Sequence, residues 1–358
     1  MEQMENQCLV FRVDGSAAAG TGHIMRCLAL AQAWRDAGGR ACFISAKGFA
    51  ALEERLRSEG CEVLSANFVP GSISDARWTA AAARQRKASW IVVDGYHFGA
   101  DYQQAMKDSR ASLLFIDDCG HSGRYAADIV LNQNLYASED LYRDRASYTR
   151  LLLGTEYALL RREFAQWREW PREISAAARN ILVTLGGVDS ANITQKVLDV
   201  LQRLDLGDTH IKIVAGVGNV HLESLRHAVG EDGRVELLTA VDDMAQLMVW
   251  ADLAISAAGS TCWELASTGL PSCVVVLADN QLPVARSLEE AGAAVNIGWW
   301  RDDASERLLA AVTTLREDAE RRRRMSEIGT HIVDAAGARR VTERLMERPV
   351  TKSSLLVA

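Results

Sequence analysis

Short apolar segments alternate with segments of helical periodicity, twice along the chain, and this alternation limits the possible folds most strongly. Apolar runs occur in the first half at residues 9–13, 41–45, 90–94 and 113–117. They recur in the second half at residues 180–184, 211–215, 253–256 and 273–277. Continuous apolar strands separated by helices are typical of a parallel sheet that helices cover on both faces. The sequence therefore predicts an α/β fold in which two Rossmann-like domains face a central cleft.

The segment 161–178 breaks this alternation, because it is charged, contains tryptophan and carries Pro171. We therefore predict an N-terminal domain over residues 1–165, a linker over 166–178, a C-terminal domain over 179–340 and a tail over 341–358. A length of 358 residues is appropriate for two such domains. Ligands of open parallel sheets bind beyond the carboxyl ends of the strands. The polar motifs that follow the strands are therefore the candidate sites.

Composition excludes several classes of protein. The content of 48% hydrophobic and 24% charged residues is that of a globular protein, and a formal charge of −7 disfavours binding to a nucleic-acid backbone. No apolar run approaches the ~18 residues of a membrane span, and the polar N-terminus does not resemble a signal peptide. Seven scattered cysteines without a C-x-x-C pair fit a reducing compartment. We expect a cytoplasmic monomer whose partner is a small molecule, with no nucleic-acid or membrane partner.

The first polar motif joins the first predicted strand to the first predicted helix and runs from Asp14 to Arg26. Gly20 and Gly22 permit positive φ and a close approach of ligand to backbone, and the next helix presents N–H groups to an anion. His23 follows Gly22 directly, where a neutral imidazole can accept a proton from water. We predict His23 as the catalytic base, with substrate contacts from Asp14, Gly22 and Arg26. A buried ion pair between Asp14 and Arg26 is the structural alternative.

Two familiar nucleotide motifs do not fit this loop. The residues after Gly22 lack the third glycine of G-x-G-x-x-G, and no Gly-Lys-Ser/Thr follows, so we exclude a dinucleotide fingerprint and a Walker loop. A lone histidine is more often structural than catalytic, and His97 and His121 also follow predicted strands. His23 is the leading candidate because a glycine turn places it at the edge of the sheet.

A second motif, from Gly259 to Glu264, follows a strand of the second domain. Gly259, Ser260 and Thr261 offer backbone N–H and hydroxyl groups to a diphosphate, and Glu264 can accept hydrogen bonds from a ribose. An ordinary capping box, with Ser260 or Thr261 as N-cap and Glu264 as its partner, explains the same residues. We predict all four as nucleotide contacts.

Three further groups follow predicted strands. Gly186 and Gly187 form a turn that is predicted to face the phosphates, and we assign them to the nucleotide site. Two adjacent glycines are a weaker signal for such a site than the motif from Gly259 to Glu264. Asn280 and Gln281 offer side chains that recognise sugar hydroxyls or amides, although an ordinary helix start has the same composition. Tyr96 ends a strand toward the predicted cleft, and the alternative is a packing residue with a solvent-exposed hydroxyl. We predict sugar contacts from Tyr96, Asn280 and Gln281.

The sequence also lacks several motifs of catalytic sites. It contains no Asp-x-Asp, and no His/Cys/carboxylate cluster has the spacing of a metal site. We therefore expect no metal and no cofactor, with the diphosphate held by N–H groups. The absence of G-x-S-x-G weighs against a serine hydrolase.

Taken in order, the motifs carry a family resemblance over about residues 10–298. The most specific strings are Gly20-Thr-Gly-His-Ile-Met-Arg-Cys-Leu28 and Tyr157-Ala-Leu-Leu-Arg161 with Glu163-Phe164. The chain resembles the family of UDP-2,4-diacetamido-2,4,6-trideoxy-β-L-altropyranose hydrolases of pseudaminic acid biosynthesis, which is related to the MurG-type enzymes. Other matching segments are Arg12-Val-Asp14, Val92-Val-Asp94 with Tyr96, Phe115-Ile-Asp-Asp118, Leu131-Asn-Gln-Asn134, Leu153-Gly154, Leu185-Gly-Gly187, Ala258-Gly-Ser-Thr261 with Trp263-Glu264, Gly269-Leu-Pro271 and Asn280-Gln281.

This resemblance implies a GT-B-like fold and metal-independent cleavage of the anomeric carbon–oxygen bond of a UDP-sugar, with inversion. It implies that His23 orients or deprotonates water and that Tyr96 and Asn280 contact the sugar. The chain departs from the family at Asp279, where glutamate is usual, and at Gly95, where a larger polar residue is common. Both positions face the predicted sugar pocket.

Three functions compete at this stage. The first is a UDP-sugar hydrolase, and the second is a glycosyltransferase that uses the same donor. Transferases of this fold that work at membranes usually show an exposed basic and apolar patch on the N-terminal domain. The sequence shows no such patch, which favours water or a soluble acceptor. The third, a binding protein without chemistry, is disfavoured because binding alone does not require a base at His23.

Overall fold

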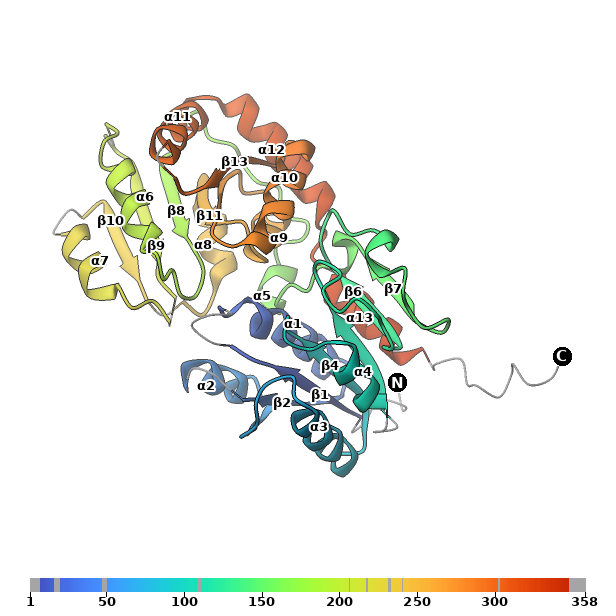
Figure 1. Cartoon of the computed structure of the whole chain (residues 1–358). Coiled ribbons are helices and arrows are strands. Elements are labelled where there is room, and N and C mark those ends of the chain that lie inside the picture. Colours follow the sequence, from blue (N-terminus) through green and yellow to red (C-terminus); the bar gives the residue numbers. More distant parts are fainter. Residues whose placement is uncertain are drawn as a thin grey trace. The chain divides into compact units, whose positions relative to one another are not determined.

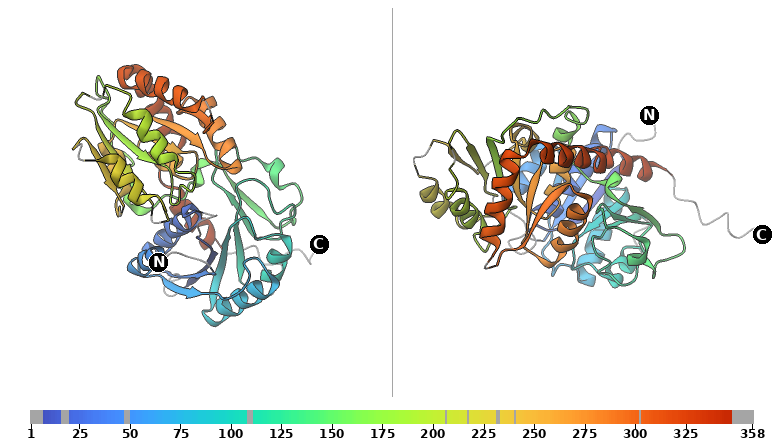
Figure 2. Two further views of the ribbon diagram at one scale, coloured as in Figure 1. Left: turned by 60° about the vertical axis from the view of Figure 1, so that its left-hand side comes forward. Right: turned by 90° about the horizontal axis from the view of Figure 1, so that it is seen from above.

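The computed structural model describes residues 7–15, 20–46, 50–107, 111–205, 207–216, 218–230, 233–239, 241–301 and 303–347. Its contacts divide the chain into two compact units (Figure 1). The first unit comprises residues 1–15, 23–161 and 336–358, and the second comprises residues 16–22 and 162–335. Each unit contains one parallel sheet with helices on both faces (Figure 2). The predicted α/β fold class is confirmed.

Seven parallel strands form the sheet of the first unit, in the order β3-β2-β1-β4-β5-β6-β7. Because all strands run in the same direction, their carboxyl ends share one edge of the sheet. The strands are β1 (Cys8–Val13), β2 (Arg40–Ser45), β3 (Glu62–Ser65), β4 (Ala88–Asp94), β5 (Ser112–Ile116), β6 (Ile129–Asn132) and β7 (Arg150–Leu153). The helical segments that accompany this sheet are α1 (Gly22–Asp36), α2 (Ala50–Ser58), α3 (Ile73–Gln85), α4 (Ala100–Lys107), η1 (Glu139–Tyr142), η2 (Thr155–Tyr157) and α13 (Gly337–Met346).

Helix α1 packs on one face of this sheet because its apolar residues recur at helical spacing. Ile24, Leu28 and Trp34 are all buried and join the strands in one core cluster. Burying a large apolar side chain stabilises a fold by ~1.5–3 kcal/mol. The opposite face is covered by α3 and α4, whose apolar side chains belong to a separate cluster. This packing fixes the first turn of α1 at the carboxyl edge of the sheet.

The C-terminal helix α13 belongs to the first unit, which corrects the predicted domain limits. Val341 and Leu345 are buried in the core cluster that contains α1, and Trp90 Nε1 donates to the carbonyl of Leu345 at 2.9 Å. The prediction assigned residues 336–340 to the C-terminal domain and 341–358 to a tail. Residues 348–358 lie outside the described part of the chain. The apolar residues at 338, 341 and 345 lie on one face of α13, and this face packs against the sheet.

Six parallel strands form the sheet of the second unit, in the order β10-β9-β8-β11-β12-β13. The strands are β8 (Asn180–Thr184), β9 (His210–Val214), β10 (Val235–Leu238), β11 (Leu253–Ala257), β12 (Ser272–Val276) and β13 (Ala294–Trp299). Its helical segments are α5 (Arg162–Ala165), α6 (Ile193–Leu201), α7 (Leu222–Val229), α8 (Met244–Trp250), α9 (Thr261–Ser267), η3 (Asp279–Gln281), α10 (Leu282–Ala291), α11 (Ala304–Glu317) and α12 (Ala319–Ile332).

The segment predicted as a linker, residues 166–178, packs on the second unit. Arg172 donates to the carbonyl oxygens of Met248, Ala251 and Thr268 at 2.6, 2.6 and 2.8 Å. Burial lowers the pKa of Arg172 to about 10. The guanidinium thereby satisfies carbonyls at the ends of α8 and α9, so this segment is part of the second unit. No helix among the described residues is long and apolar enough to cross a membrane.

Candidate active site

The first turn of α1 and the end of β4 bring a histidine and a carboxylate together. His23 Nδ1 lies 2.7 Å from Asp94 Oδ1, and only 11% of the His23 side chain is exposed. Asp94 is the last residue of β4 and is fully buried. Because a carboxylate can only accept, Nδ1 carries the proton and Nε2 has a lone pair for a proton from another molecule. The pair has the geometry of a general base with an orienting carboxylate.

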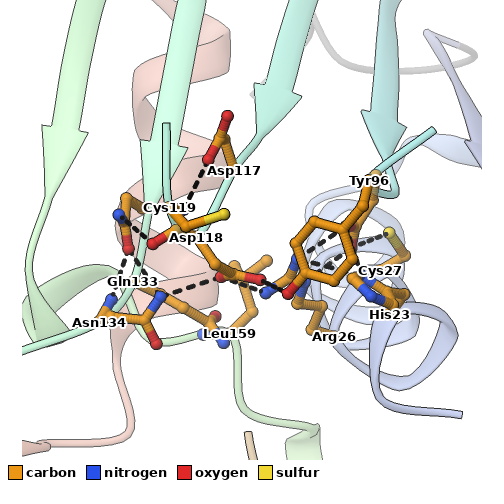
Figure 3. A network of polar contacts seen from close by, with 12 residues as sticks. His23, Arg26, Cys27, Tyr96, Asp117, Asp118, Cys119, Gln133, Asn134 and Leu159 are labelled. Carbon is orange, nitrogen blue, oxygen red and sulfur yellow. Dashed lines mark hydrogen bonds and ion pairs between the residues drawn. The ribbon is translucent and has the colours of Figure 1, made fainter. Parts of the chain in front are cut away.

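Arg26, one turn after His23, neutralises the buried carboxylates. Its Nε and Nη2 donate to the two oxygens of Asp94, both at 2.7 Å. Its Nη1 donates to Asp118 Oδ1 at 2.7 Å (Figure 3). Nη2 also lies 3.1 Å from His23 Nδ1. Both atoms carry protons, so they form no hydrogen bond with each other, and His23 Nδ1 remains the donor to Asp94. Removal of Arg26 would leave two buried negative charges without compensation.

Asp118 connects this pair to the neighbouring strands. The Tyr96 hydroxyl donates to Asp118 Oδ2 at 2.9 Å, and Asn134 Nδ2 donates to Asp118 Oδ1 at 2.9 Å (Figure 3). The Tyr96 and His23 rings meet edge to face, with their centroids 5.1 Å apart. Tyr96 itself is 40% exposed. The structure thus brings three predicted residues, His23, Arg26 and Tyr96, into one network that reaches the surface.

The charges in this network fix its protonation state. Burial alone would raise the pKa of Asp94, but the charges of Arg26 and His23 outweigh it and lower that pKa below its usual range. Burial is likewise outweighed at Asp118, where Arg26 lowers the pKa of the carboxyl. The same carboxylates raise the pKa of Arg26. Both carboxylates are therefore ionised at neutral pH and are ready to stabilise a charged imidazole.

Asp14 lies outside this network, and the predicted alternative of an Asp14–Arg26 ion pair is wrong. Asp14 pairs with Arg12 at 2.8 Å, accepts from the Ala46 backbone N–H at 2.7 Å, and lies 3.1 Å from His97 Nε2. Burial would raise its pKa, but His97 and Arg12 lower it instead. The side chain is only 5% exposed. The Asp14 carboxylate therefore fixes the position of the His97 side chain and of the backbone that follows β2.

The two glycines of the first loop have different roles. Gly20 has φ of +73°, a left-handed conformation that side chains rarely adopt. Gly22 is the first residue of α1. The turn therefore ends just before His23, and the helix begins with the residue that precedes the predicted base.

The predicted nucleotide residues all follow strands of the second unit. Gly186 comes two residues after β8, with φ of +90°, and Gly187 follows it. Gly259 and Ser260 lie between β11 and α9. These loops end neighbouring strands, since β8 and β11 pair directly, so they share one edge of the sheet.

The capping hydrogen bond that the structural alternative assigns to the Ser260 side chain is not observed. Ser260 is the N-cap of α9, but its side chain makes no capping hydrogen bond. Thr261 is the first residue of α9, and Glu264 lies in its first turn. Cap formation therefore does not account for the hydroxyl of Ser260, and a role as nucleotide contacts stays a prediction for Ser260, Thr261 and Glu264.

Asn280 and Gln281 lie in η3, directly after β12. Gln281 Oε1 accepts from the Leu277 backbone N–H at 2.9 Å, and its Nε2 lies 3.9 Å from where a Cβ on Gly259 would be. Gln281 is therefore fixed to the end of β12 and lies near Gly259 in the loop after β11. Asn280 is exposed. Contact of either residue with a sugar stays a prediction.

The site prediction omitted three residues that hold the network together, namely Asp94, Asp118 and Asn134. Each stands at or just after the end of a strand, which is the signal that identified Tyr96. They occur in segments that carry the family resemblance, but a carboxylate at a strand end gives no sign by itself of which cation it binds. Their partners became visible only when β4, β5 and β6 were placed side by side.

The family comparison identifies the second unit. Residues 180–339 match the family described as "Glycosyltransferase family 28 C-terminal domain". This range spans β8 to the first residues of α13. It contains all six predicted nucleotide residues together with Asn280 and Gln281.

Three curated relatives differ in how much of the chain they match. The spore coat polysaccharide biosynthesis protein SpsG of Bacillus subtilis is 26% identical over 93% of this chain and 96% of its own length. The UDP-2,4-diacetamido-2,4,6-trideoxy-β-L-altropyranose hydrolase of Campylobacter jejuni is 25% identical over 70% of this chain and 85% of its own. The UDP-N-acetylglucosamine–N-acetylmuramyl-(pentapeptide) pyrophosphoryl-undecaprenol N-acetylglucosamine transferase of Salinibacter ruber is 38% identical over 42% of this chain, which spans only 41% of that protein.

Solved structures match the whole chain at low identity. MurG of Acinetobacter baumannii has a TM-score of 0.61 at 17% identity, over 95% of this chain and 99% of its own. A Staphylococcus aureus MnaA–UDP co-structure has a TM-score of 0.67 at 14% identity, over 96% of both chains. Identities this low establish the fold alone. Residues 180–339 are thus similar to a glycosyltransferase family 28 C-terminal domain, and the chain has a two-domain, GT-B-like fold that matches MurG.

Proposed function

We propose that this chain is an enzyme that cleaves the bond between the anomeric carbon of a sugar and the phosphate oxygen of UDP. The observation that carries this proposal is the His23–Asp94 pair, with its 2.7 Å hydrogen bond at the carboxyl edge of the sheet. A protein that only binds a nucleotide sugar has no use for a base that a buried carboxylate orients. The predicted contacts at 259–264 and 186–187 supply the nucleotide site in the second unit.

The proposed reaction transfers one proton and one glycosyl group. His23 Nε2 takes the proton from an attacking oxygen, which forms a bond to the anomeric carbon as the bond to UDP breaks. The bonding electrons leave with the diphosphate, and attack from the opposite side inverts the anomeric centre. Asp94 stabilises the imidazolium without taking its proton. General base catalysis of this kind contributes typically ~10²–10⁴-fold.

The second unit is proposed to hold UDP through neutral donors. Backbone N–H groups near Gly186, Gly187 and Gly259 and the hydroxyls of Ser260 and Thr261 suit the diphosphate, and Glu264 suits the ribose. Support comes from the family 28 match over residues 180–339 and from a co-structure of a chain of this fold with UDP. The sequence contains no Asp-x-Asp to hold a metal on the diphosphate, so we propose that the reaction requires no metal.

Two acceptors are compatible with His23, and we place a hydroxyl acceptor first. The family model is that of a glycosyltransferase, and a transferase is among the relatives at 38% identity. The structure also exposes three apolar side chains, Phe68, Val69 and Ile73, at 37%, 74% and 43%. The absence of an exposed basic and apolar patch stays a prediction, although these three side chains add apolar surface to the first unit. An acceptor with an apolar portion fits such a surface.

Water is the second candidate acceptor, which makes the enzyme a UDP-sugar hydrolase. The Campylobacter jejuni hydrolase supports it, at 25% identity over 85% of its own length. The same His23–Asp94 pair deprotonates water or a hydroxyl, so the geometry of the base does not separate these acceptors. The sugar proposed in either case is an acetamido-deoxy sugar.

One experiment separates these outcomes. Purified protein is incubated with a panel of UDP-linked acetamido sugars in ¹⁸O-labelled water, with and without soluble or lipid-linked saccharides, and the products are weighed by mass spectrometry. A glycoside without label, formed only with acceptor, supports transfer. Free sugar with label at the anomeric oxygen supports hydrolysis. Label in the UDP phosphate, or no UDP release with any donor, overturns the proposal.

A further inference from the structure

Three residues with metal-binding side chains follow β5 at alternate positions, namely Asp117, Cys119 and His121. Their donor atoms all lie within 4.8 Å of one another. Asp117 is buried, His121 is half-buried, and Cys119 is the one exposed cysteine of the seven. Asp118, between the first two, points away toward Arg26 and Tyr96 (Figure 3). The sequence prediction that no cluster has metal spacing is therefore contradicted in the described part of the chain.

The orientation of His121 places a lone pair opposite a carboxylate. His121 Nε2 lies 3.1 Å from the carbonyl oxygen of Phe98, which only accepts, so Nε2 carries a proton. The other ring nitrogen, Nδ1, is buried, lies 3.0 Å from Asp117 Oδ2, and makes no hydrogen bond of acceptable angle. Two lone pairs at this distance repel each other unless a positive charge stands beside them. Histidines that bind metals usually donate their other N–H to a carbonyl or carboxylate in this way.

Asp117 is held in place by donors that leave room for a cation. The backbone N–H groups of Cys119 and Gly120 both donate to Oδ1 at 2.7 Å, and the Tyr125 hydroxyl donates to Oδ2 at 2.5 Å. A carboxylate has about four acceptor positions, so Oδ2 can still bind a cation beside Tyr125. Outer donors of this kind fix metal ligands in place.

A cation placed between these two groups, His121 and Asp117, removes that repulsion. It also gains the sulfur of Cys119 as a ligand, because all three donor atoms lie within 4.8 Å of one another.

We propose that Asp117, Cys119 and His121 bind a thiophilic divalent cation of the class of Zn²⁺. A thiolate, an imidazole and a carboxylate are the ligand set that Zn²⁺ accepts, whereas Mg²⁺ and Ca²⁺ prefer oxygen alone. Around a tetrahedral Zn²⁺ neighbouring donors lie roughly 3.3–3.6 Å apart, so the group closes with small side-chain rotations.

This site adjoins the proposed sugar site without belonging to it. The Tyr96 and His121 rings meet edge to face, with centroids 5.5 Å apart, and Asp118 stands between two of the ligands. Occupancy therefore fixes the segment from Asp117 to His121, which carries the partner of Tyr96 and Arg26. No step of the proposed reaction uses the cation, so its binding is tested separately from activity.

The test measures metal binding by the full chain. Protein is stripped with EDTA and dialysed, and Zn²⁺ is titrated in competition with a chromophoric chelator. A parallel titration with Cd²⁺ follows the ultraviolet charge-transfer band of a cadmium–thiolate bond. We expect one equivalent of Zn²⁺ and the cadmium band in the wild type. Cys119→Ser should abolish the band, and both Cys119→Ser and His121→Gln should weaken Zn²⁺ binding at least tenfold.

Two controls keep the result interpretable. Cys61→Ser removes a buried cysteine, and His331→Gln removes a histidine of α12 in the second unit, so neither should change affinity or stoichiometry. Thermal unfolding of each apo variant shows whether it is folded. The proposal is overturned if the wild type binds no stoichiometric Zn²⁺. It is also overturned if folded Cys119→Ser and His121→Gln bind Zn²⁺ as tightly as the wild type does.

Discussion

The two units share one architecture but present opposite chemistry at the carboxyl edges of their sheets. In the first unit, the edge carries buried charges: Asp94 is fully buried, and the Arg26 side chain is 6% exposed. In the second unit, the loops after β8 and β11 carry Gly186, Gly259 and Ser260, which are small and neutral, while the carboxylates of Glu264 and Asp279 stand farther along, in α9 and η3. Similar parallel sheets thus support an ionised network in one case and neutral donors in the other.

This difference matches two separate requirements of a nucleotide-sugar enzyme. A proton acceptor needs a fixed orientation and a nearby negative charge to stabilise its cationic form, which the buried carboxylates supply. A diphosphate is itself an anion, and carboxylates at its binding edge would repel it, whereas N–H and hydroxyl groups attract it. We infer that chemistry resides in the first unit and nucleotide recognition in the second. The predictions below test that division.

The substitution His23→Ala should have the largest effect, which is a loss of turnover. Without the imidazole, the attacking oxygen keeps its proton, so we expect kcat to fall by ~10²–10⁴-fold. Binding of UDP, measured by calorimetry, should stay within a factor of two, because the nucleotide residues lie in the second unit. The matched control is His227→Ala, on α7 of the second unit, which should change neither quantity.

Either of two results would break the proposed division. Turnover of His23→Ala within threefold of the wild type removes this residue from the mechanism. A large loss of UDP binding in His23→Ala, with a folded protein, assigns the histidine to recognition.

The substitution Asp94→Asn should have the next largest effect. It should lower the free energy of unfolding by an amount that depends on pH. Breaking a buried ion pair by removing one partner costs about 3–5 kcal/mol, and Arg26 retains Asp118 as a second partner, so we expect the lower part of that range. Because the pKa of Asp94 in the folded protein lies below that of an ordinary aspartate, its contribution to stability is fully present above about pH 4. That contribution is lost as pH falls toward the folded pKa.

Urea unfolding of wild type and Asp94→Asn at several pH values measures this effect. The gap between the two proteins should be constant near neutral pH and should narrow below about pH 4, because protonation weakens the wild-type pair as well. A gap that widens on acidification would contradict the ion-pair assignment. Turnover should also fall, since an amide no longer selects the His23 tautomer.

The fold was predictable because its signal is local and repeated. The apolar runs that became β1, β4, β5, β8, β11 and β12 are long enough to identify, and parallel order follows from the helices between them. Strands β3, β6, β7 and β13 were not predicted. The first three have four residues each, and such short runs resemble ordinary loop or helix segments, whereas Asn296 and Gly298 interrupt the apolar run of β13. The predicted limits divided helix α13 between the C-terminal domain and the tail, because its partners, such as Trp90, lie far earlier in the chain.

The site was predictable only in part, for a different reason. His23 and Tyr96 were identified from their positions after a glycine turn and a strand. Asp14 and Arg26 were paired with each other as an alternative, yet each has another partner. Sequence gives the position of a charge along the chain, whereas pairing depends on which strands are neighbours in the sheet. Asp94 meets Arg26 because β1 lies beside β4.

A further stability effect tests the membership of α13 in the first unit. Leu345 is 4% exposed and packs in the core with the strands, whereas its neighbour Met346 is 40% exposed. Leu345→Ala should lower the free energy of unfolding by about 2–5 kcal/mol, and Met346→Ala should change it by less than about 0.5 kcal/mol. Hydrogen exchange should locate the lost protection in the first sheet. Lost protection confined to the second sheet would move α13 to the second unit.

The smallest effect is expected from Ser260→Ala, at the neutral edge. The Ser260 side chain makes no capping bond to α9, so its loss should not cost the ~1 kcal/mol typical of an N-cap, and the melting temperature should stay unchanged. If its hydroxyl binds the diphosphate equally in ground and transition states, KM for the UDP-sugar should rise about fivefold while kcat stays constant. Ser224→Ala, on α7, is the control. A fall in kcat at constant KM would place this hydroxyl in the chemical step, and the division between a charged catalytic edge and a neutral binding edge would then fail.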